Sequence, residues 1–96
     1  MSVRKADIVE VIERKLGPRV TKKDISMVIN IFLKEISSLL AEGKRIEIRG
    51  FGVFKSKRRN SKIARNPRTG KEINIPARLV PVFKPSKILK QVVTQK

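Results

Sequence analysis

The spacing of apolar residues in the first 43 positions predicts two helices. The first is expected over residues 3–16, with Ser2 as its candidate N-cap and Gly17-Pro18 as its end. Gly favours the left-handed position that follows a helix, and Pro cannot continue the hydrogen-bond ladder. The apolar face of this helix collects positions at three- and four-residue steps, namely Ile8, Val11, Ile12 and Leu16.

The second predicted helix runs from Thr21 to Gly43 and carries a wider apolar stripe. Thr21 and Asp24 have the spacing of a helix-capping pair, and Gly43 suits the C-terminal cap. A stripe this wide has too few partners inside so small a body, so we expect a second copy of the chain to cover it. The stripe comprises Ile25, Val28, Ile29, Phe32, Ile36, Leu39 and Leu40, and is widened by Met27, Ile31 and Leu33.

The middle of the chain alternates in the way that strands do. Residues 45–49 predict a strand with its two isoleucines inward, followed by a turn at Gly50-Phe51-Gly52. Val53 and Phe54 open a second strand, but from Lys55 onward the alternation loses its apolar member. A strand with no side to bury is expected to project from the body as an arm.

Turn chemistry marks the end of this arm. Asn66-Pro67-Arg68-Thr69-Gly70 predicts a tight turn, and residues 71–75 alternate again as the return strand. Residues 79–83 re-enter as an apolar strand, which Pro76 and Pro81 place at a sheet edge or a bulge. A short helix is expected to start within residues 84–87.

These elements predict a single α+β domain over residues 1–96. Its parts are a helical dimerisation part over 1–43, a three-stranded antiparallel sheet over 44–84 with a long hairpin arm at about 55–78, and a C-terminal helix over 85–96.

Charge points to the class of partner. The net charge is +16, and residues 55–84 hold ten Lys or Arg but a single acid, Glu72. An excess confined to one segment favours a polyanion such as nucleic acid. A membrane surface fits less well, because no basic amphipathic helix carries bulky aromatic residues on its other face.

Several classes of chemistry lack their usual residues. The chain has no Cys and no His, and no apolar run approaches the roughly 18 residues of a membrane span. We find no pairing of nucleophile with base and no metal-binding set. We therefore expect an intracellular protein that is not an enzyme, with no cofactor, metal or small-molecule substrate.

Three segments carry a resemblance: residues 46–54, residues 65–71, and residues 80–85 followed by Lys87 and Leu89. Together they resemble one family, the HU and integration host factor proteins of bacteria. The resemblance implies an intertwined dimer that bends double-stranded DNA in the bacterial nucleoid. Residues 46–54 look more like the sequence-preferring integration host factor branch. Ala64 and Ser86 depart from the family pattern, which often has Gly at both positions.

The resemblance assigns roles along the arm. Pro67 corresponds to the residue that wedges between base pairs, although from the sequence alone it is a turn residue. Arg65 and Arg68 would enter the minor groove on either side of it. The remaining arm residues expected to contact DNA, mainly through phosphates, are Lys55, Lys57, Arg58, Arg59, Lys62, Asn66, Lys71 and Arg78.

Further contacts are expected on the body. By resemblance, Glu47 orients Arg49 toward the minor groove; the alternative is a surface ion pair between the two. Lys84 continues the basic track. Ser86 and Lys87 stand at a helix start, where backbone N–H groups favour a phosphate, or where Ser86 simply caps the helix.

Aromatic residues admit two readings. Phe51, Phe54 and Phe83 resemble base-stacking residues of single-strand binders, but their apolar neighbours favour packing. We assign them to the dimer core together with Ile29, Phe32 and Ile36.

A second function shares the size, charge and basic arm of this chain. A structural RNA-binding protein of the ribosomal type is the alternative, and the wide apolar stripe favours the DNA-bending dimer over it. The residues leave open a homodimer or a heterodimer, specific or non-specific binding, the bend angle, and which DNA process the protein serves.

Overall fold

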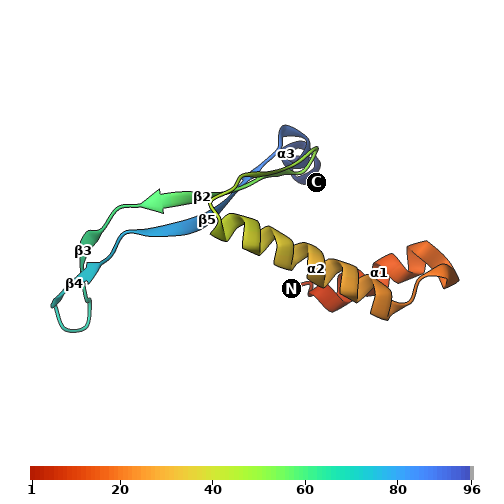
Figure 1. The fold of residues 1–96 in the computed structure, drawn as a ribbon, viewed down its shortest axis with the longest axis horizontal. Helices are drawn as coiled ribbons and strands as arrows, with labels where there is room; N and C mark the ends of the chain where they lie inside the picture. The colour runs from red at the N-terminus through yellow and green to blue at the C-terminus, as the bar shows by residue number, and fades with distance from the viewer. Residues whose placement is uncertain (96) are drawn as a thin grey trace. The chain divides into compact units, whose positions relative to one another are not determined.

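A computed structural model describes residues 1–95 of the chain (Figure 1). It forms two compact units, residues 1–38 and residues 39–96, which are described separately. Helix α2 crosses the boundary between them. The elements in order are α1 (Lys5–Leu16), the 3₁₀ turn η1 (Gly17–Arg19), α2 (Lys22–Ala41), β1 (Ile46–Ile48), β2 (Gly52–Arg59), β3 (Lys62–Arg65), β4 (Glu72–Ile75), β5 (Arg78–Pro85) and α3 (Lys87–Thr94).

Helix α1 begins at Lys5, two residues later than expected. Its N-cap is Arg4, whose backbone N–H donates to Oδ2 of Asp7 at 2.8 Å. The assignment of Ser2 was wrong because the Asp7 carboxylate satisfies the free N–H at Arg4 instead. The predicted end is confirmed, since Gly17 has φ 74°. Within this unit α1 and α2 are joined by Lys5 Nζ, which donates to Oδ1 of Asn30 at 2.6 Å.

Both predicted ends of α2 are confirmed. Thr21 Oγ1 accepts from the N–H of Asp24 at 3.1 Å, which satisfies one free donor of the first turn. At the other end Gly43 has φ 78°, and its N–H donates to the carbonyl of Leu40 at 3.0 Å. The N–H of Lys44 reaches back to Leu39 at 3.0 Å, which completes a Schellman cap.

The second unit contains the expected three-stranded antiparallel sheet, in the order β1-β2-β5. Strand β5 lies at an edge, as Pro81 predicted. The first hairpin, between β1 and β2, differs from the prediction in two details. Strand β1 is shorter than residues 45–49, and Gly52 belongs to β2 rather than to the turn. The turn is closed by the Phe51 N–H, which donates to Ile48 O at 2.9 Å, with Gly50 at φ 80°.

The arm is a hairpin in two pieces rather than one continuous ladder. Strands β2 and β5 run side by side as far as the pair Arg59–Arg78, and β3 and β4 then form a separate two-stranded sheet (Figure 1). Residues 60–61 and 76–77 lie between the two pieces outside any strand. Pro76 has no N–H to donate, so it cannot extend the ladder across the break.

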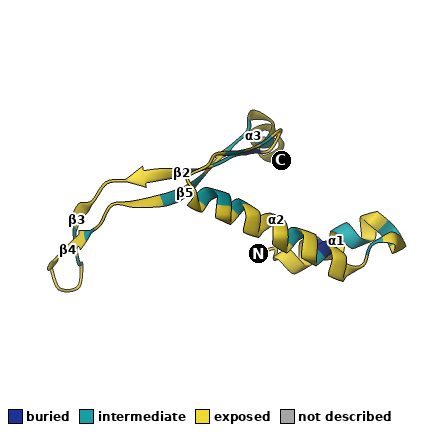
Figure 2. Ribbon diagram, viewed as in Figure 1, coloured by how far each residue is buried: buried dark blue, intermediate teal, exposed yellow. Residues whose placement is uncertain are grey.

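Residues 1–95 bury very little apolar surface. The buried hydrophobic side chains among them are Val9 and Ile25, and the teal and yellow of Figure 2 extend over most of each helix. Val28 is 67% exposed and Phe32 is 53% exposed. The residues expected in a dimer core are half-buried or exposed in the single chain, and half of the α2 stripe is exposed.

One aromatic cluster forms in the second unit. The ring centroid of Phe83 lies 4.7 Å from that of Phe54 and 5.4 Å from that of Phe51, with tilted ring planes. Such geometry is favourable for aromatic pairs and uses the rings in packing. No helix in the described residues is long and apolar enough to cross a membrane.

Candidate nucleic-acid interface

The register of the three-stranded sheet places its charges on one side. Residues paired across antiparallel strands share a face, and successive residues alternate between faces. Lys55 pairs with Val82, Lys57 with Val80, and Val53 with Lys84. The side that they share is here called the basic face, and its charged members are Glu47, Lys55, Lys57, Arg59, Arg78 and Lys84.

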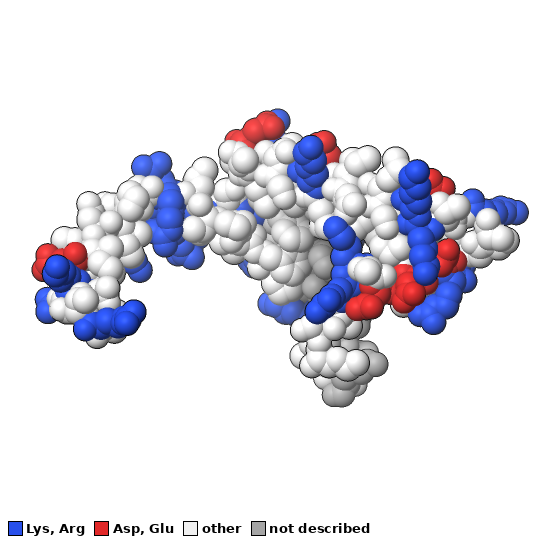
Figure 3. Space-filling model, turned by 90° about the horizontal axis from the view of Figure 1, so that it is seen from below, with Lys and Arg blue, Asp and Glu red and all other residues white. Residues whose placement is uncertain are grey.

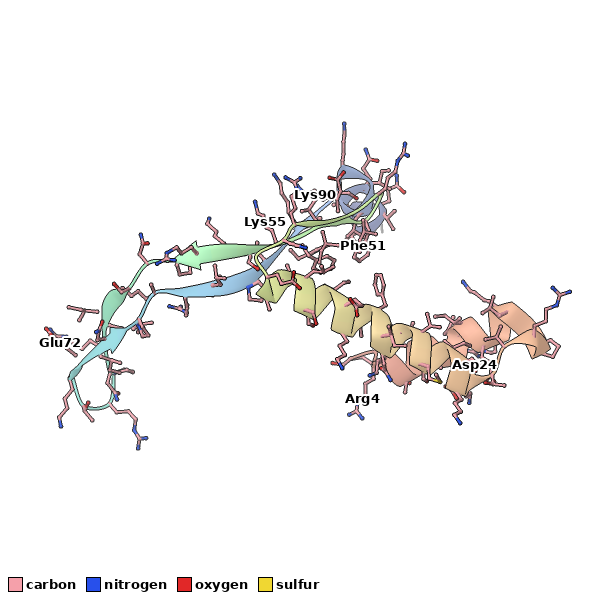
Figure 4. All side chains as sticks on the ribbon, viewed as in Figure 1. Arg4, Asp24, Phe51, Lys55, Glu72 and Lys90 are labelled. Carbon is pink, nitrogen blue, oxygen red and sulfur yellow. The ribbon has the colours of Figure 1, made fainter. Side chains whose placement is uncertain are left out.

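The opposite side of the sheet is the packing face. It carries the Phe54–Phe83 pair, and Ser56, whose hydroxyl donates to the carbonyl of Leu40. In Figure 4 the side chain of Lys55 extends from one side of the strands and the ring of Phe51 from the other. Arg58 pairs with Leu79 and lies on the packing face. The register thus separates Arg58 from Lys55, Lys57, Arg59 and Arg78.

The outer piece of the arm also has two sides. Arg65 pairs with Glu72 on one side, whereas Lys62 pairs with Ile75 on the other. In Figure 3 basic side chains are present along the arm as far as its end. Glu72 is the only acid among residues 55–84. Positive charge therefore extends along the arm, with Lys62 and Arg65 directed to different sides of it.

Hydrogen bonds within the tip hold Pro67 in a defined turn. Asn66 Oδ1 accepts from the N–H of Arg68 at 2.9 Å, and Asn66 O accepts from the N–H of Gly70 at 2.7 Å. Gly70 takes φ 72°, which explains the preference for Gly at this position. The amide oxygen of Asn66 is thus committed to the turn, while Pro67 and Arg68 are exposed.

A hollow of about 280 Å³ lies beside the first hairpin, where β1 ends, β2 begins and β5 ends. It brings together four of the body residues predicted to contact DNA: Glu47 from β1, Arg49 from the turn, Lys84 from β5 and Ser86 before α3. Lys87 does not line it. The hollow also includes Arg45, which was not among the predicted DNA contacts. The strict alternation of Arg45, Glu47 and Arg49 with two isoleucines would have indicated that the three charges share a face.

The ion pair between Glu47 and Arg49, considered as the alternative reading, is not formed. Glu47 Oε2 lies 3.9 Å from Nη2 of Arg45, and residues 1–95 show no ion pair between Glu47 and Arg49. Arg49 lies in the turn after β1. Both members of the Arg45–Glu47 pair are exposed, so the contact contributes at most about 1 kcal/mol.

Ser86 is the N-cap of α3. Its Oγ accepts from the N–H of Leu89 at 3.0 Å and donates to the carbonyl of Gly50 at 3.0 Å. Capping, one of the two roles considered for this residue, is therefore present. Strand β5 continues to Pro85, so the helix starts at Lys87, at the end of the range predicted for it.

The site offers positive charge and an exposed turn. Among the described residues there is no group of three or more His, Cys, Asp or Glu placed to hold a metal ion. What the geometry presents is a basic face, a hollow with three basic side chains, and an exposed Pro in a hydrogen-bonded turn at the tip. This arrangement suits an anionic polymer.

Comparison with known proteins agrees with this reading. Residues 3–94 match the family model for bacterial DNA-binding proteins. The chain is 41% identical to integration host factor subunit beta of Hahella chejuensis over 90% of this chain and 87% of that protein. It is 43% identical to the same subunit of Halorhodospira halophila, over 91% and 84% respectively.

Solved structures give the same result. An Anabaena HU–DNA cocrystal structure matches with a TM-score of 0.88 at 31% identity, covering 98% of this chain and all of that one. HU from Thermotoga maritima matches with a TM-score of 0.66 at 27% identity, covering 95% and 98%. The chain therefore belongs to the bacterial DNA-binding protein family of HU and integration host factor, whose members are architectural DNA-binding proteins rather than enzymes.

Proposed function

We propose that this chain pairs with a second chain, clamps double-stranded DNA between two arms, and bends it through the minor groove. The observation that carries the proposal is the basic face of the sheet, whose strands lead into an arm with further basic residues and the exposed Pro67 at its tip. The basic face neutralises phosphates and supplies affinity. The tip supplies the change in DNA shape.

The phosphate contacts come from the basic face and the arm beyond it. Each phosphate neutralised releases condensed counterions, so the logarithm of the binding constant falls with the logarithm of salt concentration by about 0.9 per contact. The basic side chains on one side of the sheet contact phosphates along the same DNA strand. They are Lys55, Lys57, Arg59, Arg78 and Lys84. Lys62, Lys71 and the Lys87 side chain extend this track at its two ends.

Pro67 acts as the wedge. Architectural proteins of the minor groove, of which HU and integration host factor are established examples, insert apolar residues between base steps at a cost of about a few kcal/mol per step. Pro67 has a rigid apolar ring and no N–H to desolvate. The Asn66–Arg68 hydrogen bond holds its turn before DNA arrives, which lowers the entropy lost on insertion.

Arg65 and Arg68 flank the wedge in the groove. A narrow minor groove has a strong negative potential that attracts guanidinium groups. Arg68 is exposed in the tip turn and Arg65 ends β3 immediately before it. Both side chains therefore stand within reach of the base step that Pro67 opens.

Exposed apolar side chains support the paired state. The 20-residue helix α2 leaves Met27, Val28, Ile31, Phe32 and Leu33 between 47% and 67% exposed. A second family chain that covers them would supply the core that the single chain lacks. We assign Ile29, Phe32, Ile36, Phe51, Phe54 and Phe83 to this core. The Hahella relative is named as a beta subunit, so the partner could be a second copy of this chain or a related chain. Sedimentation of the purified chain distinguishes them: a dimer indicates a homodimer, and a monomer indicates that a different chain is needed.

The hollow provides a second contact with DNA on the body. Arg49 enters the minor groove there, and Arg45, Glu47 and Lys84 shape the potential around it. This contact is the proposed source of any preference among sequences. Through these contacts the protein organises DNA in the bacterial nucleoid. Co-localisation of a fluorescent fusion with a DNA stain in cells would test this location.

The wedge is tested by measuring the bend with energy transfer between the labelled ends of a duplex. Pro67→Ala is expected to reduce the bend more than it reduces affinity, whereas Pro76→Ala, at the break in the arm, leaves the bend unchanged. An unaltered angle in Pro67→Ala overturns the wedge role. A gel-shift comparison of nicked duplex DNA with double-stranded RNA tests the choice of nucleic acid.

A further inference from the structure

Two hydrogen bonds join the start of α3 to the turn that carries Arg49. The N–H of Ser86 donates to the carbonyl of Phe51 at 2.9 Å. The hydroxyl of Ser86 donates to the neighbouring carbonyl of Gly50 at 3.0 Å. These contacts span 36 positions of sequence between Gly50 and Ser86. A single residue thus fixes two consecutive peptide groups of the turn.

The hydroxyl of Ser86 has no proton left for a DNA phosphate. A serine hydroxyl carries one donor, and here that donor is used by Gly50 O. One of its lone pairs accepts from the N–H of Leu89 at 3.0 Å, which ties the first turn of α3 into the same arrangement. The role of Ser86 at the interface is therefore indirect.

The turn needs such a restraint because of the residue at its centre. Gly50 takes φ 80°, and Gly has more accessible backbone conformations than any other residue. Arg49 precedes it and is exposed, outside strand β1. Without the bond to its carbonyl, Gly50 would rotate more freely and the backbone that carries Arg49 would sample several directions.

We propose that Ser86 is a positioning residue, whose hydroxyl fixes the Gly50 carbonyl and thereby directs Arg49 toward DNA from the hollow. This role rests on the proposed contact between Arg49 and the minor groove. Ser86 lines the same hollow as Arg49, so the restraint acts at the place where the guanidinium group leaves the body. Preorganisation of this kind lowers the entropy cost of binding.

A double-mutant cycle on the full-length protein separates this role from a direct contact. Affinity for one nicked duplex is measured for the wild type, Ser86→Ala, Arg49→Ala and the double variant. We expect Ser86→Ala to weaken binding about threefold to tenfold, the effect of one lost hydrogen bond. In the Arg49→Ala background the same change is expected to have no further effect, because Ser86 acts through Arg49.

Two further variants control for folding. Ser86→Thr keeps a hydroxyl and is expected to restore wild-type affinity. Thr94→Ala removes a hydroxyl that bonds to Lys90 O within the same helix, and is expected to leave affinity unchanged. Amide hydrogen exchange of the free protein adds a direct readout: Ser86→Ala should speed exchange at Phe51, whose N–H closes the turn, whereas Ser86→Thr should not.

The outcomes distinguish the failure of each idea. If Arg49→Ala binds as well as the wild type, the proposed contact of Arg49 is wrong and the positioning role falls with it. If Arg49→Ala weakens binding but Ser86→Ala is neutral, or the two effects add, only the role of Ser86 is overturned. The bend measured with Pro67→Ala is independent of either result.

Discussion

The ring of Phe83 packs directly against the backbone of Gly52. A Cβ atom at Gly52 would lie 2.6 Å from Cε1 of this ring and 2.6 Å from the carbonyl oxygen of Lys84. Gly52 is buried, and it pairs with Ile48 on one side and Pro85 on the other. The absence of a side chain at this position lets the aromatic cluster close over the sheet.

Gly52→Ala is therefore expected to destabilise the protein by about 1–3 kcal/mol, because a methyl group forces the ring and the strand apart. Urea unfolding followed by circular dichroism measures the change. When Gly52→Ala is combined with Phe83→Leu, the loss of stability should be smaller than the sum of the two single losses, because the ring atoms that clash with the new methyl group are removed. The clash with the Lys84 carbonyl persists. A Gly52→Ala protein as stable as the wild type would show that the cluster relaxes freely.

Two neighbouring residues of β2 are expected to behave differently toward DNA. Lys57 lies on the basic face and Arg58 on the packing face. Lys57→Gln should lower the slope of affinity against salt by about 0.9 on logarithmic scales, the loss of one phosphate contact. Arg58→Gln, which also removes one charge, should leave the slope nearly unchanged.

Titration of one duplex at several salt concentrations gives both slopes. Equal reductions for the two variants would mean that the arm wraps DNA with both faces, and would contradict the assignment of one basic face.

The tip depends on the side chain of Asn66. Asn66→Ala removes the acceptor for the N–H of Arg68 and is expected to loosen the turn that presents Pro67. Hydrogen exchange at the Arg68 amide should become faster in the free protein, and the bend should become smaller. Asn66→Ser offers a weaker acceptor at the same place and should be intermediate.

This prediction distinguishes a turn-holding role from a contact with DNA. Unchanged Arg68 exchange in Asn66→Ala, together with weaker binding, would assign Asn66 to DNA itself.

Most of the secondary structure followed from local pattern. The capping of α2 by Thr21 and Gly43 and the edge position of Pro81 were all predictable, because each depends on a few neighbouring residues. The start of α1 was not, since Ser2 and Asp7 both offer a side-chain oxygen that can satisfy a free N–H of the first turn. The choice between such caps depends on differences in helix stability of about 1 kcal/mol.

The interface was predictable in composition but not in arrangement. The basic arm, the turn at its tip and the family motifs are properties of the sequence, because charge and turn chemistry do not depend on distant contacts. Membership of the HU and integration host factor family was visible for the same reason. That Arg58 shares its face of the sheet with Phe83, and that Ser86 bonds to Gly50, were decided by the tertiary structure. Both depend on strand register and on contacts between residues far apart in the chain, which no local pattern specifies.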